Sequence, residues 1–335
     1  MIEIQHPTLH KHLEGIQFID LFAGLGGFRL AMESFGAECV FSSEKDVHAQ
    51  DVYERNFTDR PHGDITKIAA EDIPQHDILC AGFPCQAFSI SGKQRGFEDT
   101  RGTLFFDVAR IIKTCQPKVV FLENVKNFAT HDKGRTIKTV QNTMNELGYD
   151  FHYKVLNATD FGVPQNRARI YMVAFRRDLK IQNFAFPESI PLKSHVEDIL
   201  LPRDGICDGV AIKDLIVERK DSIWHEQKSQ TLDFSKTIRL GMVGKGGQGE
   251  RIYSPKGVGI TLSAHGGGIF AKTGGYLIEG KVRRLHPREC ARLSGFPDDY
   301  QLSLKSNQAY TQFGNTVVVD VLQRILQQII KVLPL

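Results

Sequence analysis

Short apolar runs alternate with amphipathic stretches through the first half of the chain. Buried strands are predicted over residues 16–22, 39–43, 78–81, 119–122 and 169–175. A helix is predicted over 28–35, and Gly36 can end it in the left-handed conformation. Strands separated by helices predict right-handed crossovers and a mainly parallel α/β sheet. Ligands of such sheets bind at the carboxyl ends of the strands.

The alternation fades after residues 187–202, and glycine becomes frequent. Residues 236–284 hold 13 of the 30 glycines and nine Lys or Arg against two Glu. Residues 198–233 have five basic and eight acidic residues, so the net charge of +3 for the whole chain hides a basic block. A basic, glycine-rich block suits a surface that lies along a phosphate backbone, although a solvated loop region has the same composition.

A last helix is predicted over residues 320–332. Its apolar side chains recur at helical spacing and predict a face that packs on the first domain: Val321, Leu322, Ile325, Leu326, Ile329 and Ile330.

Composition narrows the class of protein. The 335 residues are 41% hydrophobic and 24% charged, which is typical of one large or two modest globular domains. No apolar run approaches the roughly 18 residues of a membrane span, and residues 1–15 lack an apolar signal core. The six cysteines form no CxxC pair. We therefore expect a reduced, cytoplasmic protein with no disulfide scaffold, no membrane contact and no bound metal.

A glycine-rich turn, residues 22–27 (FAGLGG), follows the first predicted strand and opens the helix. Its glycines let backbone amides approach a ligand. Glu44 lies 20 residues after Gly24, where an acid can accept both hydroxyls of a ribose. Asp64 ends another short segment and can meet an adenine amino group. The pattern predicts an adenosine-containing cofactor, and a simple surface acid is the alternative for Glu44.

Reactive side chains follow the later strands. Cys85 lies in the rigid loop 82–86 (GFPCQ), and the other five cysteines are expected to be inert packing residues. Glu123 ends the strand 119–122, where burial can keep a carboxyl protonated and able to donate a proton. Arg167 and Arg169 point to opposite faces of an extended chain, so one can reach the cleft while the other braces the structure. A pair of salt bridges is the alternative for the two arginines.

Together these clusters resemble the bacterial DNA (cytosine-5) methyltransferases. The shared motifs occur in the family's order and span nearly the whole chain: DLFAGLGG (20–27), GFPCQ (82–86), ENV (123–125), QNRARI (165–170) and FGNTVV (313–318). Segments 79–107, 239–254 and 264–277 are similar to a GCGC-specific member of the family. The resemblance implies a doubly wound, Rossmann-like catalytic domain that depends on S-adenosylmethionine. It also implies a smaller, irregular, β-rich target-recognition domain.

The resemblance assigns the cofactor site. S-adenosyl-L-methionine, which leaves as S-adenosyl-L-homocysteine, would lie with its methionine end at the glycine turn. Phe22 would contact the adenine, Glu44 the ribose and Asp64 the adenine amino group. The complete set implied for the cofactor is Phe22, Gly24, Leu25, Gly26, Gly27, Glu44, Asp64, Pro84 and Asn315. Asn315 would also help to join the domains.

The resemblance also assigns the chemistry. The Cys85 thiolate would add to C6 of cytosine, and loss of the C5 proton after methylation would expel it. Glu123 would hold N3 and the exocyclic amine, Arg169 the ring oxygen, and Arg167 would support the site. The target base must leave the duplex to react, as methyltransferases as a class require.

Contacts to double-stranded DNA are implied in two regions. A mobile loop, 93–103, would close over the duplex. Ser91 and Gln248 would fill the space left by the flipped cytosine, and Arg251 can read a guanine edge by bidentate contact. The DNA contacts implied are Ser91, Gln248, Glu250, Arg251, His265 and Gly268. The implied target is GCGC, methylated on the inner cytosine. This methylation would protect host DNA from a restriction endonuclease that shares the site and need not bind the protein.

Two residues depart from the similar GCGC-specific relative. Lys45 stands in place of an aromatic residue, and its stem can cover one face of an adenine but cannot stack as a ring does. His265 stands in place of a tyrosine, and an imidazole can titrate near neutral pH. The first departure concerns cofactor affinity and the second a DNA contact.

The expected division has three parts. A catalytic cofactor-binding domain covers 1–197 and is completed by the helix 315–335. A DNA target-recognition domain covers 198–286, and a hinge covers 287–314. The family expectation is a monomer with DNA in the cleft between the domains.

Three other functions compete with this interpretation. A tRNA cytosine-5 methyltransferase of the same fold would not need the basic block 236–284. An inactive DNA-binding regulator would not need Cys85, Glu123, Arg167 and Arg169 together. A nicotinamide-linked thiol enzyme leaves QNRAR and FGNTVV without a role.

Overall fold

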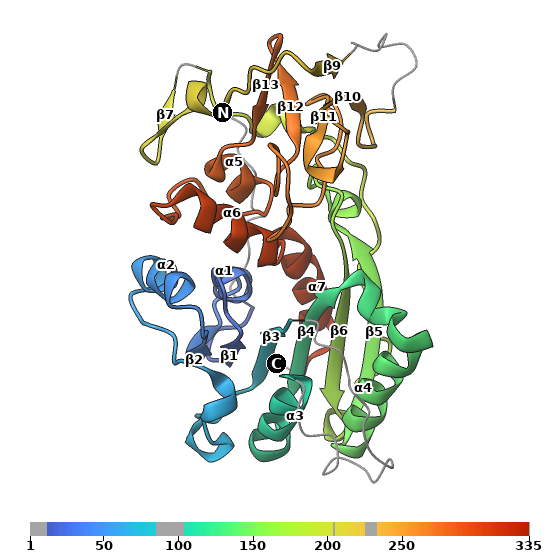
Figure 1. Ribbon diagram of the computed structural model, residues 1–335. Coiled ribbons are helices and arrows are strands. Elements are labelled where there is room, and N and C mark those ends of the chain that lie inside the picture. The colour runs from blue at the N-terminus through green and yellow to red at the C-terminus, as the bar shows by residue number, and fades with distance from the viewer. Residues whose placement is uncertain (1–11, 85–103, 204, 225–232, 335) are drawn as a thin grey trace. The chain divides into compact units, whose positions relative to one another are not determined.

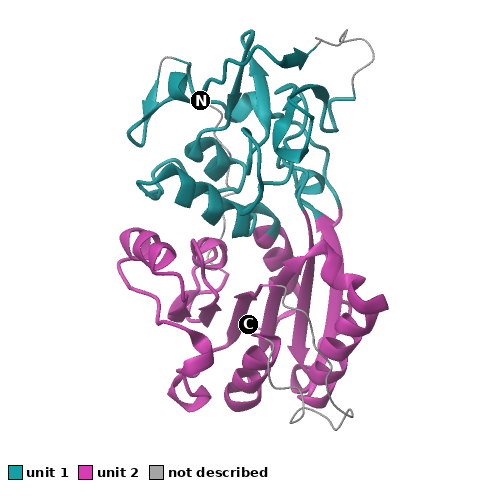
Figure 2. Cartoon of the chain, in the orientation of Figure 1, with its two compact units in different colours: residues 1–3, 157–167, 189–321 teal, residues 4–156, 168–188, 322–335 magenta. Residues whose placement is uncertain are grey.

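The structure is a computed structural model that describes residues 12–84, 104–203, 205–224 and 233–334. The chain divides into two compact units (Figure 2). Of the described residues, unit 2 takes those within 4–156, 168–188 and 322–335, and unit 1 takes those within 157–167 and 189–321. No helix in the described ranges is long and apolar enough to cross a membrane.

Unit 2 is built on a six-stranded sheet with the order β2-β1-β3-β4-β6-β5 (Figure 1). Its strands are β1 (Gln17–Leu21), β2 (Glu38–Ser43), β3 (Ile78–Gly82), β4 (Val119–Val125), β5 (Tyr149–Asn157) and β6 (Ala168–Arg176). Its helices are α1 (Gly27–Glu33), α2 (Val47–Phe57), α3 (Leu104–Cys115), α4 (Arg135–Glu146) and, from residue 322 on, α7 (Val319–Val332). All five strands predicted in the first half are present, and Gly36 has the expected positive φ of 89°.

The parallel arrangement holds for four of the six strands. β1 pairs in parallel with β2 and with β3, and β3 pairs in parallel with β4. β6 is antiparallel to β4. No α-helix lies between β5 and β6, and without a helical crossover β6 need not run parallel to its neighbours.

Alternating side chains of this sheet form two cores. Ile19, Leu79 and Leu122 face α3 and α4, which lie in front of the sheet in Figure 1. On the other face, Phe28 of α1 packs edge-on against Phe121, with ring centroids 5.1 Å apart. The predicted apolar stripe of α7 is buried, apart from the half-buried Ile330, and this helix lies behind the sheet. Unit 2 is therefore a three-layer α/β unit.

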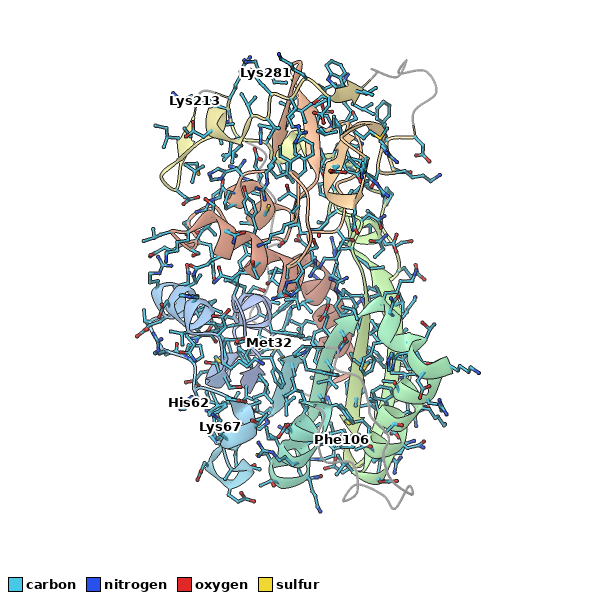
Figure 3. The ribbon with its side chains drawn as sticks, viewed as in Figure 1. Met32, His62, Lys67, Phe106, Lys213 and Lys281 are labelled. Atoms are coloured by element: carbon cyan, nitrogen blue, oxygen red, sulfur yellow. The ribbon has the colours of Figure 1, made fainter. Side chains whose placement is uncertain are left out.

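Unit 1 contains a five-stranded sheet with the order β13-β12-β11-β10-β9 and a two-stranded ladder, β7-β8. The elements are β7 (Ile206–Cys207), β8 (Val210–Ala211), β9 (Ser222–Trp224), β10 (Arg239–Val243), β11 (Arg251–Tyr253), β12 (Gly275–Ile278), β13 (Lys281–Arg284), α5 (Pro287–Arg292) and α6 (Ser306–Asn315). A small apolar core on the five-stranded sheet consists of Val243, Ile252, Phe270, Leu277 and Val282. Lys213 and Lys281 project at the outer edge of this unit (Figure 3).

The two units divide the chain differently from the expected domains, whose boundaries stay a prediction. Residues 157–167 belong to unit 1, although they separate two strands of unit 2. Gln165 Nε2 donates a hydrogen bond to Leu293 O at 2.8 Å, and the Arg167 side chain donates to the carbonyls of Leu262 and Thr316. The expected hinge, 287–314, lies within the compact part of unit 1. Hydrophobic periodicity carries no signal for such long-range hydrogen bonds.

Candidate functional site

The glycine turn between β1 and α1 is fastened to the end of β2. The Ala23 N–H donates to Ser43 O at 2.9 Å. The Gly24 N–H donates to the Glu44 carboxylate at 2.9 Å. A Cβ on Gly26 would lie 2.8 Å from Cζ of the Phe57 ring, and Gly26 also has a positive φ of 72°. Only glycine fits this position.

Glu44 is oriented by backbone amides before any ligand binds. Its Oε2 accepts from Gly24 N–H at 2.9 Å, and its Oε1 accepts from Asp46 N–H at 2.8 Å. Each carboxylate oxygen has a second lone pair that can accept from a hydroxyl group. The side chain is therefore preset to receive the two hydroxyls of a ribose.

Asp64 is held in a similar way on the next loop. Its Oδ1 accepts from the Thr66 N–H at 3.1 Å and from the Thr66 hydroxyl at 2.9 Å. These hydrogen bonds hold the pKa of the Asp64 carboxyl below its usual value, and the charge of nearby Lys45 acts in the same direction. The second oxygen can accept from an amino group such as that of adenine.

A cavity of about 220 Å³ opens between these loops in unit 2. Its lining residues are Phe22, Ser43, Glu44, Lys45, Gly63, Asp64, Ile65, Thr66 and Leu104. Aromatic and aliphatic side chains can cover a purine, while the two acids can bind donors at its amino and ribose ends. The donor set therefore fits the adenosine part of S-adenosylmethionine.

The structure separates the residues expected at the cofactor site into three groups. Phe22, Glu44 and Asp64 line the cavity. The glycine turn contains Gly24, Leu25, Gly26 and Gly27. The Gly24 N–H donates to Glu44, and Leu25 and Gly27 are buried. Pro84 is exposed after β3, and Asn315 is exposed at the end of α6 in unit 1. Of the lining residues, sequence reasoning missed Ser43, Gly63, Ile65, Thr66 and Leu104. The Asp-x-Thr spacing could have indicated Thr66, whereas nothing in the sequence marks Leu104.

A buried ion pair lies at the carboxyl end of β4 in unit 2. Arg169 Nε lies 3.1 Å from Glu123 Oε1, and both side chains are largely buried. Next to Glu123, the Asn124 side chain donates to Phe83 O at 2.8 Å and fixes the start of the loop after β3. Glu123 is buried as expected, but its neighbour is a guanidinium, which burial alone did not predict.

Cys85 and Ser91, together with the loop 93–103, lie outside the described residues. The five described cysteines are Cys39, Cys80, Cys115, Cys207 and Cys290. Burial raises the pKa of each of these thiols, to about 12 for Cys39. None of them forms a thiolate readily, which agrees with their expected role as packing residues.

Arg167 is a brace within unit 1. Its Nη1 donates to Leu262 O at 3.0 Å, and its Nη2 donates to Gly314 O at 3.1 Å and to Thr316 O. Arg169, two residues later, points to Glu123 in unit 2. The two arginines thus make these contacts in different units.

The glycine-rich basic block, 236–284, folds into β10 to β13 of unit 1 and the segments between them, and it carries all the expected DNA-contact residues except Ser91. Gln248 and His265 are exposed. Glu250 accepts from the Gly247 N–H at 2.9 Å, and Arg251 begins β11. Gly268 lies against Gly249, where an added Cβ would meet Gly249 O at 2.6 Å. The loops 244–251 and 263–270 are therefore neighbours.

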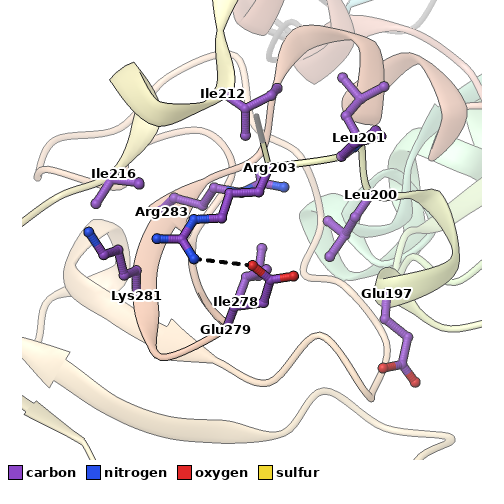
Figure 4. Close-up of a pocket in the computed structure, with 11 residues that line it drawn as sticks. Glu197, Leu200, Leu201, Arg203, Ile212, Ile216, Ile278, Glu279, Lys281 and Arg283 are labelled. Carbon is purple, nitrogen blue, oxygen red and sulfur yellow. Dashed lines mark hydrogen bonds and ion pairs between the residues drawn. The ribbon is translucent and has the colours of Figure 1, made fainter. Parts of the chain in front are cut away.

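Two further clusters in unit 1 do not form candidate sites. A cavity of about 230 Å³ is lined in part by Arg203 and Glu279, but these two side chains pair with each other (Figure 4). Cys207, Asp208 and His286 bring possible metal ligands within 4.8 Å of one another. The Asp208 carboxylate already binds Arg288, and His286 bonds through both ring nitrogens. A cation would have to break these contacts.

The comparison with known proteins agrees with this geometry. The model of the family described as C-5 cytosine-specific DNA methylase matches residues 16–331. The chain is 62% identical to the type II methyltransferase M.HhaI of Haemophilus parahaemolyticus over 98% of this chain and 97% of that protein. It is 45% identical to the type II methyltransferase M.HpaII of Haemophilus parainfluenzae, over 92% of this chain and 88% of that protein.

Solved structures show the same fold at low sequence identity. Dnmt2 methyltransferase of S. pombe matches with a TM-score of 0.67 and 18% identity, over 94% of this chain and 98% of that one. A putative DNA modification methyltransferase from a prophage of E. coli matches with a TM-score of 0.67 and 20% identity, over 95% of this chain and 99% of that one. With the family model and the close relatives, the resemblance found in the sequence motifs is confirmed: the chain belongs to the C-5 cytosine-specific DNA methylase family.

Proposed function

We propose that this chain transfers a methyl group to C5 of the inner cytosine in the duplex sequence GCGC. The observation that carries the proposal is the Glu123–Arg169 ion pair, 3.1 Å between Nε and Oε1. It lies at the carboxyl end of β4, and the cavity with Glu44 and Asp64 lies beyond the carboxyl end of β2 in the same sheet. One edge of the sheet thus offers groups for a polar base and for an adenosine.

Cys85 is the proposed nucleophile. Its thiolate would add to C6 of the cytosine, which makes C5 electron-rich and able to attack a methyl donor. When the C5 proton leaves, the electrons of that C–H bond restore the ring double bond and Cys85 departs as thiolate. The hydrogen bond from Asn124 to Phe83 O supports this role, because it fixes the backbone two residues before Cys85.

Glu123 and Arg169 would hold the flipped base. When protonated on one oxygen, Glu123 can donate to N3 while its other oxygen accepts from the exocyclic amine, and the guanidinium of Arg169 can donate to the ring oxygen. Their mutual contact orients both groups before the base arrives, which reduces the reorganisation needed in the reaction. Arg167 would act indirectly, by bracing the segment that precedes β6.

The residues of the cavity would hold S-adenosyl-L-methionine, which supplies an electrophilic methyl group when bound. Glu44 would accept from the ribose, and Asp64 from the adenine amino group. Phe22 and the stem of Lys45 would cover the adenine. The glycine turn would let the methionine end approach the backbone.

The loops of unit 1 would read the DNA. Gln248 would replace the flipped base opposite its guanine, and Arg251 would bind a guanine edge. Glu250, His265 and Gly268 would face other bases, and the remaining cations of 236–284 would contact phosphates. The protein would act on bacterial DNA in the cytoplasm as a monomer without a metal. A restriction endonuclease of the same specificity would share the DNA site and need not bind the protein.

The test is methyl transfer from radiolabelled S-adenosyl-L-methionine to two short duplexes, one with GCGC and one with the same bases scrambled. We expect label on GCGC alone, and none with Cys85→Ala. Label on both duplexes would contradict the proposed specificity. Transfer RNA is assayed as a third substrate, and label on it and on neither duplex would contradict the DNA substrate. Binding of S-adenosyl-L-homocysteine without any label would indicate a regulator that does not catalyse.

A further inference from the structure

Two loops of unit 1 meet through glycine backbone with no room for a side chain. A Cβ on Gly249 would overlap Gly267 O and lie 3.3 Å from Ala271 Cα. A Cβ on Gly268 would lie 2.6 Å from Gly249 O and 3.1 Å from Gly249 Cα. Real Cβ atoms essentially never lie under 3.0 Å from such an atom, as the contacts with Gly267 O and Gly249 O would require. The loops therefore interlock at Gly249 and Gly268.

The interlock is tied to the core of unit 1 through Phe270. The Phe270 N–H donates to Gly249 O at 2.8 Å. The Phe270 ring is 1% exposed and packs in the small core with Ile252 and Leu277. A Cβ on Gly275 of β12 would meet this ring at 2.7 Å. A continuous set of contacts thus runs from β12 through Phe270 to Gly249.

The first loop carries Gln248 directly before Gly249 and Arg251 two residues after it. Two hydrogen bonds between Gly247 and Glu250 close this loop. The Glu250 carboxylate accepts from the Gly247 N–H at 2.9 Å, and the Glu250 N–H donates to Gly247 O at 2.9 Å. Arg251 then enters β11, where it pairs with Met242 of β10. A shift of Gly249 therefore moves the side chains on both sides of it.

We infer that Gly249 is a positioning residue for DNA sequence recognition. Through its contact with Gly268 and Phe270 it fixes the distance between the loop of Gln248 and Arg251 and the loop of His265. Gly249 need not touch a base. This inference rests on the proposed function, because it takes these loops to be the readers of the DNA sequence.

The chain offers a matched control one residue from the interlock. Gly249 has a φ of −85°, which alanine also adopts, so Gly249→Ala tests only the close approach. A Cβ on Gly267 would meet nothing within 4 Å, and its φ is not in the left-handed range. Gly267→Ala therefore adds the same methyl group to the neighbouring loop without separating the two loops.

The experiment compares single-turnover methylation of a GCGC duplex with that of duplexes that carry one changed base. The ratio is the rate on the GCGC duplex divided by the rate on a changed duplex. We expect Gly249→Ala to lower this ratio about tenfold or more, which is the effect of losing one bidentate base contact. Gly267→Ala should keep the wild-type ratio. Both variants should bind S-adenosyl-L-homocysteine with wild-type affinity in calorimetry, since the cavity lies in unit 2.

An equal loss on all duplexes, with the ratio unchanged, would mean a purely structural role and would overturn the inference. If Gly249→Ala shows no cooperative unfolding transition, Phe270→Leu takes its place. That variant keeps the N–H but loosens the anchor, and an unchanged ratio would again overturn the inference. Failure of the proposed function is seen separately, as a wild-type protein that labels no duplex. If the wild type prefers another sequence, bisulfite sequencing of a methylated plasmid identifies that sequence. The ratio of rates is then measured with duplexes that carry the identified sequence.

Discussion

Arg283 and Glu289 form a bidentate ion pair that is sealed inside unit 1. Nη1 and Nη2 of Arg283 lie 2.8 and 2.7 Å from the two carboxylate oxygens. The same oxygens accept from the backbone N–H groups of Leu201 at 2.8 Å and His286 at 2.7 Å. Glu289 is fully buried and joins the segment at Leu201 to the stretch that runs from β13 into α5.

The charge of Glu289 should be required for the stability of unit 1. Glu289→Gln leaves the Arg283 charge buried without its partner, and we expect a loss of about 3–5 kcal/mol in the free energy of unfolding. Chemical denaturation measures this loss. Glu279→Gln is the matched control, because Glu279 pairs with Arg203 at the surface, where about 1 kcal/mol or less is expected. Equal losses for the two variants would contradict the prediction.

Asp20 should make stability fall as pH rises. Burial raises the pKa of this carboxyl well above its ordinary value of 3.8, with the charge of Arg29 in opposition. Between the ordinary and the raised pKa, the folded protein keeps a proton that the unfolded chain has lost. The free energy of unfolding therefore decreases with pH across this interval. Asp20→Asn does not titrate, so its stability relative to wild type should increase from pH 5 to pH 8. A difference that is constant with pH in denaturation curves would refute this.

Glu44→Gln should weaken binding at the cavity. A glutamine has one acceptor oxygen, so it cannot accept from both Gly24 N–H and Asp46 N–H as the carboxylate does. We expect S-adenosyl-L-homocysteine to bind roughly 10- to 100-fold more weakly in calorimetry, from the cost of one or more lost charged hydrogen bonds. Glu54→Gln on α2, which removes an exposed pair with Arg60, should leave the affinity unchanged. Wild-type affinity in the Glu44 variant would argue against an adenosine at this cavity.

Lys45 should contribute to the cavity through its stem rather than its charge. The residue is exposed and lines the cavity beside Glu44. Lys45→Met keeps the aliphatic length and should bind S-adenosyl-L-homocysteine as the wild type does. Lys45→Ala removes that apolar cover and should bind roughly five- to tenfold more weakly. If Lys45→Met loses as much affinity as Lys45→Ala, the ammonium group is the part that matters.

Local patterns predicted most of the elements that carry the candidate site. β1, which ends before Phe22, and β4, which contains Glu123, each include a short continuous apolar run, and such a run predicts a buried strand. The glycine turn was predictable because Gly24, Gly26 and Gly27 follow a strand in the sequence. The structure shows why one of them is glycine, since Gly26 has no space for a side chain. β5 was not predicted, since residues 153–155 are exposed at the edge of the sheet and give no alternating pattern.

Contacts between distant segments were not predictable from patterns. The pairing of Glu123 with Arg169 depends on the register of two antiparallel strands, in which Val125 lies opposite Arg169. The bracing of Arg167 by Leu262 O depends on a carbonyl 95 residues away. Likewise, the sequence shows many glycines in 236–284, but not which two of them touch. Motif resemblance named residues at these places without indicating what holds them there.

The last helix bears on how the chain folds during its synthesis. Gln323 of α7 donates to Ser34 at the end of α1, 289 residues earlier, and Leu322, Ile325, Leu326 and Ile329 are fully buried. A ribosome therefore adds the 289 residues from Ser34 to Gln323 before unit 2 can acquire this layer. Until then the sheet face that α7 covers stays open to water and to other nascent chains. Newly made protein should thus pass through a period of protease sensitivity that ends only when α7 docks.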